Sequence, residues 1–477
     1  MTMHIQFPPN FWWGGATSGP QSEGAFDKPH DSVMDFWFKE SPNEFFDQVG
    51  PEIASDFYHR YEEDFDLMQK VGFNSFRTSI QWSRLIKDLE TGEPDEKAVD
   101  FYNRVIESAK EHDIALVMNL HHFDMPIELL QKYGGWESRH VVDLFVKFCR
   151  TAFELFGDKV RYWTTFNEPM VIPEAGYLDG FHYPKYAGKG KEAVQVIYNI
   201  NLASALAIQA FKEMHVPGEI GIILNLTPSY PRSDSKEDLA AAHFADLMYN
   251  RSFLDPAVKG HLPEELVAIW KQDGVMPEGE AGDDKVLADN TIDFLGVNYY
   301  HPKRVQAPLG EWPADKPWMP TKYFAEYEWP EMRINPYRGW EIYPQALYDI
   351  AINVRDNYNN IPWFVSENGM GVEGEEKFRG ADGEIADEYR INFYKEHLYW
   401  LNKGMQEGSM CFGYHTWAAM DCWSWNNAYK NRYGFISIHL PDQTRSIKHS
   451  GYWYKKLSET NSYDFNPETD RVDDMEA

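Results

Sequence analysis

Eight short apolar runs recur along the chain, separated by longer segments in which apolar residues recur with helical spacing. Each run is rich in β-branched or aromatic side chains and ends where the chain turns polar, which is typical of a buried strand. The runs are residues 11–16, 73–79, 114–120, 160–166, 220–225, 292–298, 361–365 and 410–417. The segments between them predict helices over residues 56–71, 97–112, 141–156, 345–357 and 388–403.

The alternation of strands and helices predicts a parallel sheet whose strands are joined by helical crossovers. A count of eight strands favours a closed barrel over an open doubly wound sheet. No GxGxxG or phosphate-binding loop follows any of the runs, which also counts against an open dinucleotide-binding fold. We therefore predict an α/β protein with a single (β/α)8 barrel domain that covers residues 1–477.

Two long segments interrupt this alternation. Residues 301–340 are rich in proline and tryptophan and show no strong helix or strand period. We interpret them as a loop after the sixth strand that covers the site, because a long unstructured loop in a compact domain is usually functional. Residues 421–450 form a second extended loop after the eighth strand.

Net charge, cysteine spacing and hydropathy exclude several classes of function. The net charge of −30 argues against a nucleic-acid partner, because phosphates would be repelled. Cys149, Cys411 and Cys422 lie in apolar surroundings without CxxC spacing, so we expect buried thiols and neither a disulfide framework nor a metal site. No signal peptide and no apolar run of membrane-spanning length is evident. We expect a cytoplasmic protein without a membrane partner.

Candidate chemistry lies at the ends of the predicted strands. Glu168 follows the fourth run and Glu367 the seventh, each beside an asparagine and close to proline or glycine. In a barrel, the carboxyl ends of the strands carry the active site. A single glutamate at a strand end is more often a solvated residue, but two in this setting match the pair of carboxyl groups that glycoside hydrolysis requires.

With these segments in place, the chain resembles glycoside hydrolase family 1 over nearly its whole length. The matching segments are residues 11–17, 21–24, 58–64, 76–84, 122–126, 165–169, 298–300 and 366–369. The set is specific, although no single segment is. The resemblance implies a single (β/α)8 barrel that hydrolyses β-glycosides with retention of configuration, without a metal or an organic cofactor.

The resemblance also implies roles for the site residues. Glu168 would be the general acid/base, protonated at working pH because the negative charge of the nucleophile helps to raise its pKa. Glu367 would be the nucleophile, supported by the charge of Arg77 and a hydrogen bond from Tyr300. The expected substrate contacts are Gln21, His122, Asn167, Asn298, Trp417 and Trp425. Taken alone, His122 and Trp417 would more often be core residues, and His121 has no assigned role.

The substrate class depends on the loop after the eighth strand. Family members that act on plain glycosides carry glutamate at the position of Ser424. Members that act on 6-phosphoglycosides carry serine there, followed by a lysine and, two residues later, a tyrosine. Ser424 and Tyr433 match this pattern, but the expected lysine position is Asn431, and Lys430 comes one residue early. A shift of the loop would bring Lys430 to the phosphate; otherwise it is a solvated charge.

These residues favour hydrolysis of 6-phospho-β-D-glucosides to glucose 6-phosphate and an aglycone. The expected partner is a phosphorylated disaccharide or aryl glycoside; a homo-oligomer is compatible with the sequence. Trp425 is typical of 6-phospho-β-galactosidases, so that activity stays open. An ordinary β-glucosidase comes next, and Ser424 counts against it. A sugar-binding barrel without catalysis comes last, because both glutamates are present.

Overall fold

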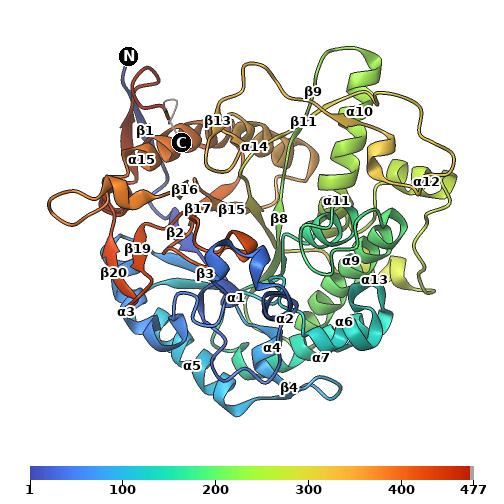
Figure 1. Ribbon diagram of the computed structural model, residues 1–477, viewed down its shortest axis with the longest axis horizontal. Helices are drawn as coiled ribbons and strands as arrows, with labels where there is room; N and C mark the ends of the chain where they lie inside the picture. The colour runs from blue at the N-terminus through green and yellow to red at the C-terminus, as the bar shows by residue number, and fades with distance from the viewer. Residues whose placement is uncertain (473–477) are drawn as a thin grey trace.

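The computed structural model describes residues 1–472, and its centre is a closed barrel of eight strands (Figure 1). Neighbouring strands of the barrel are parallel. The strands are β2 (Trp12–Ala16), β3 (Ser75–Ser79), β6 (Ala115–Asn119), β7 (Tyr162–Asn167), β8 (Glu219–Asn225), β10 (Phe294–Asn298), β15 (Trp363–Asn368) and β17 (Cys411–Trp417). The predicted barrel is therefore confirmed; residues 473–477 of the predicted domain lie outside the described residues.

Helices surround the barrel (Figure 1). All five predicted helices are present, with ends within three residues of the expected ones: α3 (Phe57–Lys70), α5 (Glu96–Glu111), α7 (Arg139–Phe156), α14 (Ala346–Asn357) and α15 (Glu388–Gln406). The others described are α1 (Gly19–Ser22), α2 (Val33–Glu40), α4 (Trp82–Leu85), α6 (Ile127–Tyr133), α8 (Val171–Pro173), α9 (Gly190–Glu213), α10 (Lys236–Asp246), α11 (Ser252–Lys259), α12 (Glu264–Gln272), α13 (Asp283–Asp289) and α16 (His449–Thr460).

Helix α5 shows how the sequence specifies such a helix. The Asp95 carboxylate accepts a hydrogen bond of 3.1 Å from the amide of Ala98, which satisfies a free donor of the first turn. Phe101, Tyr102 and Val105 recur on one face and are buried. This spacing places the apolar stripe toward the barrel and the charged residues toward solvent.

Aromatic side chains fill the end of the barrel at which the strands begin. Trp12 lies 4.8 Å from Tyr162 and 5.1 Å from Phe412, measured between ring centroids. Phe364 lies 5.4 Å from Phe412, and Phe294 lies 6.3 Å from Tyr162. Each of these residues is the first or second of its strand. The filled end leaves the opposite end, where the strands finish, to carry a cleft.

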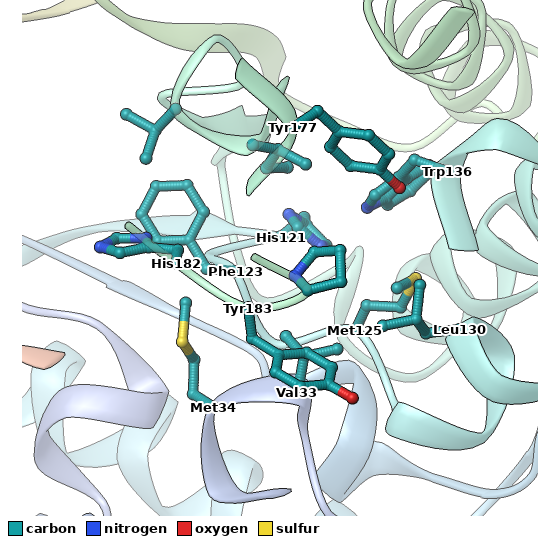
Figure 2. A pocket seen from close by; sticks show the side chains of 13 residues that line it. Val33, Met34, His121, Phe123, Met125, Leu130, Trp136, Tyr177, His182 and Tyr183 are labelled. Atoms are coloured by element: carbon teal, nitrogen blue, oxygen red, sulfur yellow. The ribbon is translucent and has the colours of Figure 1, made fainter. Parts of the chain in front are cut away.

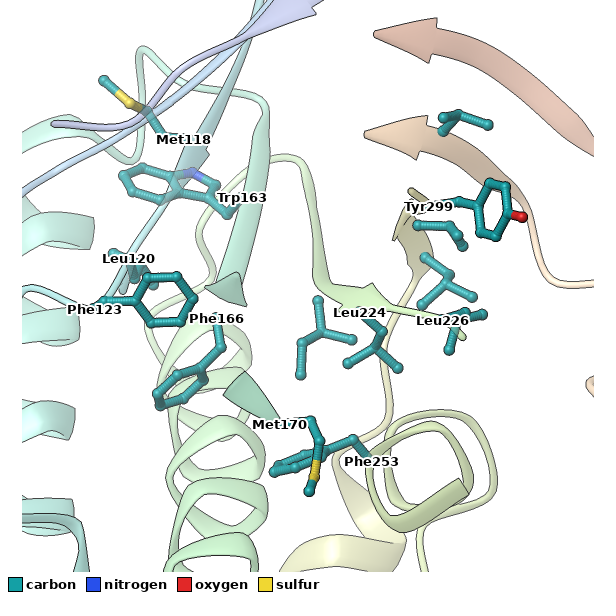
Figure 3. Packing of buried hydrophobic residues seen from close by; sticks show 14 of the residues in the cluster. Met118, Leu120, Phe123, Trp163, Phe166, Met170, Leu224, Leu226, Phe253 and Tyr299 are labelled. Atoms are coloured by element: carbon teal, nitrogen blue, oxygen red, sulfur yellow. The ribbon is translucent and has the colours of Figure 1, made fainter. Parts of the chain in front are cut away.

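A second apolar layer lies between strands and helices. Figure 3 shows part of it, where Phe166 and Leu224 of the barrel strands lie near Met170 and Phe253, and Trp163 lies beside Met118. These side chains are at most 3% exposed. All three cysteines are free and buried, as predicted from the sequence, with Cys149 and Cys411 in this core and Cys422 in a smaller cluster beside Trp417 and Tyr433.

Helix α9, a long apolar helix of 24 residues, was not among the helices predicted from the sequence. By length and composition alone, it is the one described helix that could cross a membrane. However, 83% of its apolar window is buried inside the protein. It contacts α7, α11 and α13 in the outer ring. A buried core helix meets the same criteria of length and hydropathy, so the helix is explained by this packing.

The two long loops contain short strands that are too brief to produce a period in the sequence. Residues 301–340 include β11 (Lys303–Gln306), β12 (Ala325–Glu326), β13 (Ile334–Asn335) and the start of β14 (Trp340–Glu341). The loop after β17 includes β18 (Asn431–Arg432), β19 (Ile436–His439) and β20 (Thr444–Ile447), and β18 pairs with β16 (Val372–Glu373). Near the chain ends, β1 (Met3–Gln6) pairs with β21 (Ser462–Phe465).

Candidate active site

Glu168 and Glu367 line one cleft at the end of the barrel where the strands finish. Glu367 belongs to β15, and Glu168 directly follows β7. The cleft contains about 660 Å³ of empty space and is open to solvent. Of the residues predicted from the sequence, Gln21, His122, Tyr300, Trp417, Ser424, Trp425 and Tyr433 also line it.

Two donors hold the Glu367 carboxylate. The guanidinium of Arg77, fully buried on β3, contacts Oε1. The Tyr300 hydroxyl donates to Oε2 at 2.6 Å. Burial, and then the negative charge of Glu367, raises the pKa of Tyr300 well above its ordinary value, so the phenol keeps the proton that it donates. Both oxygens are therefore occupied and the carboxylate has one orientation.

Glu168 has a different environment. Burial, followed by the negative charge of Glu367, raises the pKa of its carboxyl group to about 8. A hydrogen bond of 2.9 Å from Asn298 Nδ2 to Oε1 acts in the opposite direction and does not reverse the shift. The group therefore carries a proton at neutral pH, as a general acid must.

The backbone at Glu168 is strained. Its φ of +46° lies in the left-handed region, which costs a residue other than glycine about 1–3 kcal/mol. The Glu168 amide donates to Ile223 O of β8 at 2.9 Å and fixes this conformation. Strain of this kind persists where the surrounding structure imposes it, and it is concentrated at functional sites.

Asparagines connect the acid to the imidazole of His122. Asn298 Nδ2 also donates to Asn167 Oδ1 at 3.1 Å, and Asn167 Nδ2 lies 3.3 Å from His122 Nε2. Burial, together with the Arg77 charge, lowers the pKa of His122 well below its ordinary value, so the imidazole is neutral. Gln21 is fixed by a bond from its Nε2 to Trp423 O at 2.9 Å. These groups are hydrogen-bonding partners for sugar hydroxyls.

Aromatic rings form a wall of the cleft. The Trp417 ring stacks on His122 with centroids 6.3 Å apart and planes 14° apart. The Trp425 ring lies 6.0 Å from His122 and 5.5 Å from Phe123. Such flat apolar faces suit the C–H faces of a sugar ring.

Ser424 and Tyr433 lie in the same cleft, whereas Lys430 does not join them. Lys430 Nζ lies 3.7 Å from Glu373 and 5.8 Å from the Phe46 ring, and the side chain is 38% exposed. Asn431 pairs with Glu373 between β18 and β16 and is buried. Lys430 directly precedes β18, and the printed contacts of its ammonium group are with Glu373 and the Phe46 ring. The loop shift that would bring Lys430 to a phosphate is not present.

The cleft also contains residues that the sequence analysis did not single out, among them Arg338, Trp340, Phe123 and His182. Arg338 and Trp340 belong to the segment that was predicted to cover the site, and its tryptophan content was the available signal. His182 lies in the loop after β7 and has no local signal. Only the folded arrangement shows that these side chains face the two glutamates.

An apolar recess adjoins the cleft and contains His121 (Figure 2). Both ring nitrogens of His121 are buried without a hydrogen-bond partner in the described part of the chain. The ring packs 5.2 Å from Trp136 and 5.1 Å from Phe166, between centroids. Burial lowers the pKa of His121 to about 3, so it is a neutral packing residue.

One group outside the cleft lining has atoms spaced for a metal ion. Ligand atoms of Asp382, Glu384 and His449 lie within 4.8 Å of one another near the surface. His449 Nδ1 is 2.9 Å from Glu388, so the imidazole already has a carboxylate partner. Exposed acidic groups of this kind are common without an ion, and the two glutamates in the cleft do not depend on this group.

The barrel and its two carboxyl groups define a glycoside hydrolase. The sequence model of glycosyl hydrolase family 1 matches residues 3–463. The chain is 52% identical over 465 residues to the 6-phospho-beta-glucosidase GmuD of Bacillus subtilis (strain 168), covering 97% of this chain and 99% of that protein. It is 36% identical over 472 residues to a 6-phospho-beta-galactosidase of Clostridium acetobutylicum, with 95% and 97% covered.

A solved structure agrees with this relationship. The family 1 β-glucosidase from Thermotoga maritima superimposes with a TM-score of 0.87 at 32% identity, covering 96% of this chain and 99% of that chain. The protein therefore belongs to glycosyl hydrolase family 1.

Proposed function

We propose that the protein hydrolyses 6-phospho-β-D-glucosides with retention of configuration and releases glucose 6-phosphate and an aglycone. The observation that carries this proposal is the cleft itself. A carboxyl group that is protonated at neutral pH and a carboxylate held by Arg77 face a wall that contains Ser424 and Tyr433. The similarity to GmuD, which is named a 6-phospho-β-glucosidase, supports the same substrate class.

In the first step, Glu367 attacks C1 of the sugar while Glu168 gives its proton to the glycosidic oxygen. The C1–O bond breaks, the aglycone leaves as an alcohol, and an ester bond joins C1 to Glu367. In the second step, Glu168, now a carboxylate, takes a proton from water, whose oxygen attacks C1 and releases Glu367. Retention by this route requires the two carboxyl groups to lie roughly 5–5.5 Å apart.

Charge at the wall supports a phosphorylated substrate. Ser424 is neutral at the position where the family resemblance implies glutamate in members that act on plain glycosides, so no carboxylate here opposes a phosphate dianion. Burial raises the pKa of Tyr433, so its hydroxyl keeps the proton that a phosphate oxygen would accept. Hydrogen bonds to a charged acceptor are roughly twice as strong as neutral ones.

The preference for glucoside over galactoside rests on similarity. The chain is 52% identical to GmuD and 36% identical to the 6-phospho-β-galactosidase. Trp425, which favours the galactosidase, lines the cleft, so the epimer at O4 is the second candidate substrate. Comparing kcat/KM for the two epimeric 6-phosphates decides between them, with the glucoside expected to be the better substrate.

The decisive test compares p-nitrophenyl β-glucoside 6-phosphate with the unphosphorylated glucoside in wild type and Ser424→Glu. Wild type should prefer the phosphate, and the ratio of the two kcat/KM values should fall by about tenfold or more in the variant. The reason is that the variant replaces a neutral donor with a like charge and removes a charge-assisted bond of about 1.5–3 kcal/mol. Asn426→Gln, at an exposed residue of the same loop, serves as the control.

A wild-type enzyme without preference for the phosphate, or a ratio unchanged in Ser424→Glu, contradicts the proposal. The stereochemistry is read separately by proton NMR of the first product. A β-configured sugar phosphate is expected, and an α-configured product excludes the double-displacement route.

A further inference from the structure

Arg338 alone carries a permanent positive charge among the described residues that line the cleft. It lies in the turn that joins β13 to β14. This turn is closed by hydrogen bonds to Asn335 O from Gly339 N at 2.8 Å and from Arg338 N at 3.2 Å. These hydrogen bonds fix the backbone from which the Arg338 side chain extends. The turn is therefore ordered, although it lies in a segment whose sequence shows no regular period.

The turn is attached to the segment that also positions Tyr433. Asn335 Nδ2 donates to Gly371 O at 2.9 Å. A β-carbon at Gly371 would lie 2.3 Å from Cζ of Tyr433, so the phenol approaches the backbone more closely than any other residue type would allow. The residues around Gly371 therefore hold both Arg338 and Tyr433 at the same side of the cleft.

The guanidinium of Arg338 is oriented but not neutralised. Its Cζ lies 4.3 Å from the centroid of the Trp340 ring, a cation–π contact. Its Nε is buried and has no hydrogen-bond partner among residues 1–472. Within the same residues, none of its nitrogens forms an ion pair within 4.0 Å of a carboxylate. The positive charge of Arg338 also acts on Tyr433, lowering its pKa against the increase that burial causes.

Three other cations near the cleft already have carboxylate partners. Arg77 contacts Glu367. Arg432 lies 3.6 Å from Asp421 and donates to Ile438 O at 3.2 Å, and Lys430 lies 3.7 Å from Glu373. A dianion in a protein of net charge −30 requires compensation nearby. Beside Ser424 and Tyr433, Arg338 is the group that can supply it.

We propose that Arg338 binds the 6-phosphate of the substrate together with the hydroxyls of Ser424 and Tyr433, in place of the lysine expected at position 431. This inference rests on the phosphoglycosidase function proposed above. The guanidinium fork donates two parallel hydrogen bonds to a phosphate, and stacking on Trp340 limits the orientations of the fork. Trp340 in turn lies 5.4 Å from the Tyr300 ring, next to the nucleophile.

The test measures kcat and KM for p-nitrophenyl β-glucoside 6-phosphate and for the plain glucoside in wild type, Arg338→Gln and Arg338→Lys. The ratio of kcat/KM for the phosphate to that for the plain substrate should fall about 10- to 100-fold in Arg338→Gln, because one charge-assisted interaction is lost. Most of the loss should appear in KM for the phosphate. Arg338→Lys keeps the charge without the fork and should fall between wild type and Arg338→Gln.

Two comparisons control for general effects of charge and folding. Arg104→Gln removes the same charge at an exposed position on α5 and should leave the ratio at the wild-type value. Lys430→Ala should lower the ratio far less than Arg338→Gln. Inorganic phosphate as a competitive inhibitor gives a readout independent of turnover of the phosphorylated substrate: its inhibition constant against the plain glucoside should rise in Arg338→Gln and not in Lys430→Ala.

The two proposals fail in different ways. If wild type does not prefer the phosphate, the phosphoglycosidase function is wrong. If wild type prefers it but Arg338→Gln retains the preference and the phosphate inhibition, only the role of Arg338 is wrong. If Lys430→Ala reduces the ratio more than Arg338→Gln does, the lysine and not the arginine binds the phosphate.

Discussion

At the scale of single residues, two identical carboxyl groups differ in chemistry because their neighbours differ. Glu367 accepts from a guanidinium and a phenol. Glu168 is buried with one amide donor, and its pKa is raised to about 8. Pairs of titratable groups with environments that separate their protonation states are how one site supplies both an acid and a nucleophile at one pH.

Glu367→Gln should lower the pKa of Glu168 from about 8 but leave it above its ordinary value of 4.5. The negative charge of Glu367 is the second cause of the increase, and burial, the largest cause, stays. Carbon-13 NMR of the glutamate carboxyl groups measures this pKa in both proteins. Glu373→Gln, which removes an exposed carboxylate beside Lys430, is the control. An unchanged pKa in Glu367→Gln would mean that the two carboxyl groups do not interact.

At the scale of elements, a buried cluster of ion pairs holds the loop after β17 against α15 and the start of α16. Lys448, which precedes α16, donates to Asp421 at 3.0 Å and also contacts Glu375. Arg390 of α15 pairs with Glu375 and donates to the Arg432 carbonyl at 2.9 Å. The cluster therefore joins β18, on which the position of Lys430 depends, to two helices of the outer ring.

Lys448→Met should destabilise the protein by roughly 3–5 kcal/mol at pH 7, because it leaves Asp421 and Glu375 without the ammonium group. Burial alone would raise the pKa of Asp421, but the charges of Lys448 and Arg432 outweigh it and lower the pKa. A lowered pKa contributes stability above the ordinary value of 3.8 that is lost as pH falls through the folded-state value. The deficit of the variant should therefore shrink on acidification.

Chemical denaturation at pH 7 and at successively lower pH measures this effect. Lys455→Met, at an exposed residue of α16 that lies 3.8 Å from Glu459, is the matched control and should change stability by less than about 1 kcal/mol. If Lys448→Met and Lys455→Met both change stability by less than about 1 kcal/mol, the ion pairs of Lys448 do not stabilise the loop.

At the scale of the whole molecule, the raised pKa of Glu168 makes stability depend on pH. The pKa of Glu168 is about 8 in the folded protein and 4.5 when unperturbed, so between these values the folded state binds more protons than the unfolded state. The stability that this group contributes therefore falls as pH rises from 4.5 to about 8. Removing the titration should stabilise the protein most at the upper end of this range.

Glu168→Gln should have little effect from this cause below pH 4.5 and should stabilise the fold by roughly 3–5 kcal/mol near pH 8. Urea denaturation of wild type and variant across this range gives the difference directly. Glu459→Gln, at an exposed site, should show no such slope. A difference between Glu168→Gln and wild type that does not change with pH would show that the carboxyl group titrates near its ordinary value in the folded protein.

The sequence alone determined the barrel and the positions of both glutamates. The strands are local apolar runs, and their order and number place the residues that follow them at one end of a barrel. Tyr300 and Glu367 come together for this reason, since each lies at or just beyond the end of a strand, and Arg77 reaches Glu367 from within β3. The sequence also predicted a raised pKa for Glu168 from the neighbouring charge.

Only the tertiary structure decided the burial of Glu168 and the positions of Lys430 and Arg338, because these depend on segments far apart in the chain. Burial, which no local pattern shows, is the larger cause of the raised pKa of Glu168. The contacts of Lys430 with Glu373 and the Phe46 ring join segments far apart in the chain. Arg338 reaches the cleft because its hairpin is attached at Gly371. Long-range pairing and packing set these positions, and a periodicity within one short segment carries no information about its distant partner.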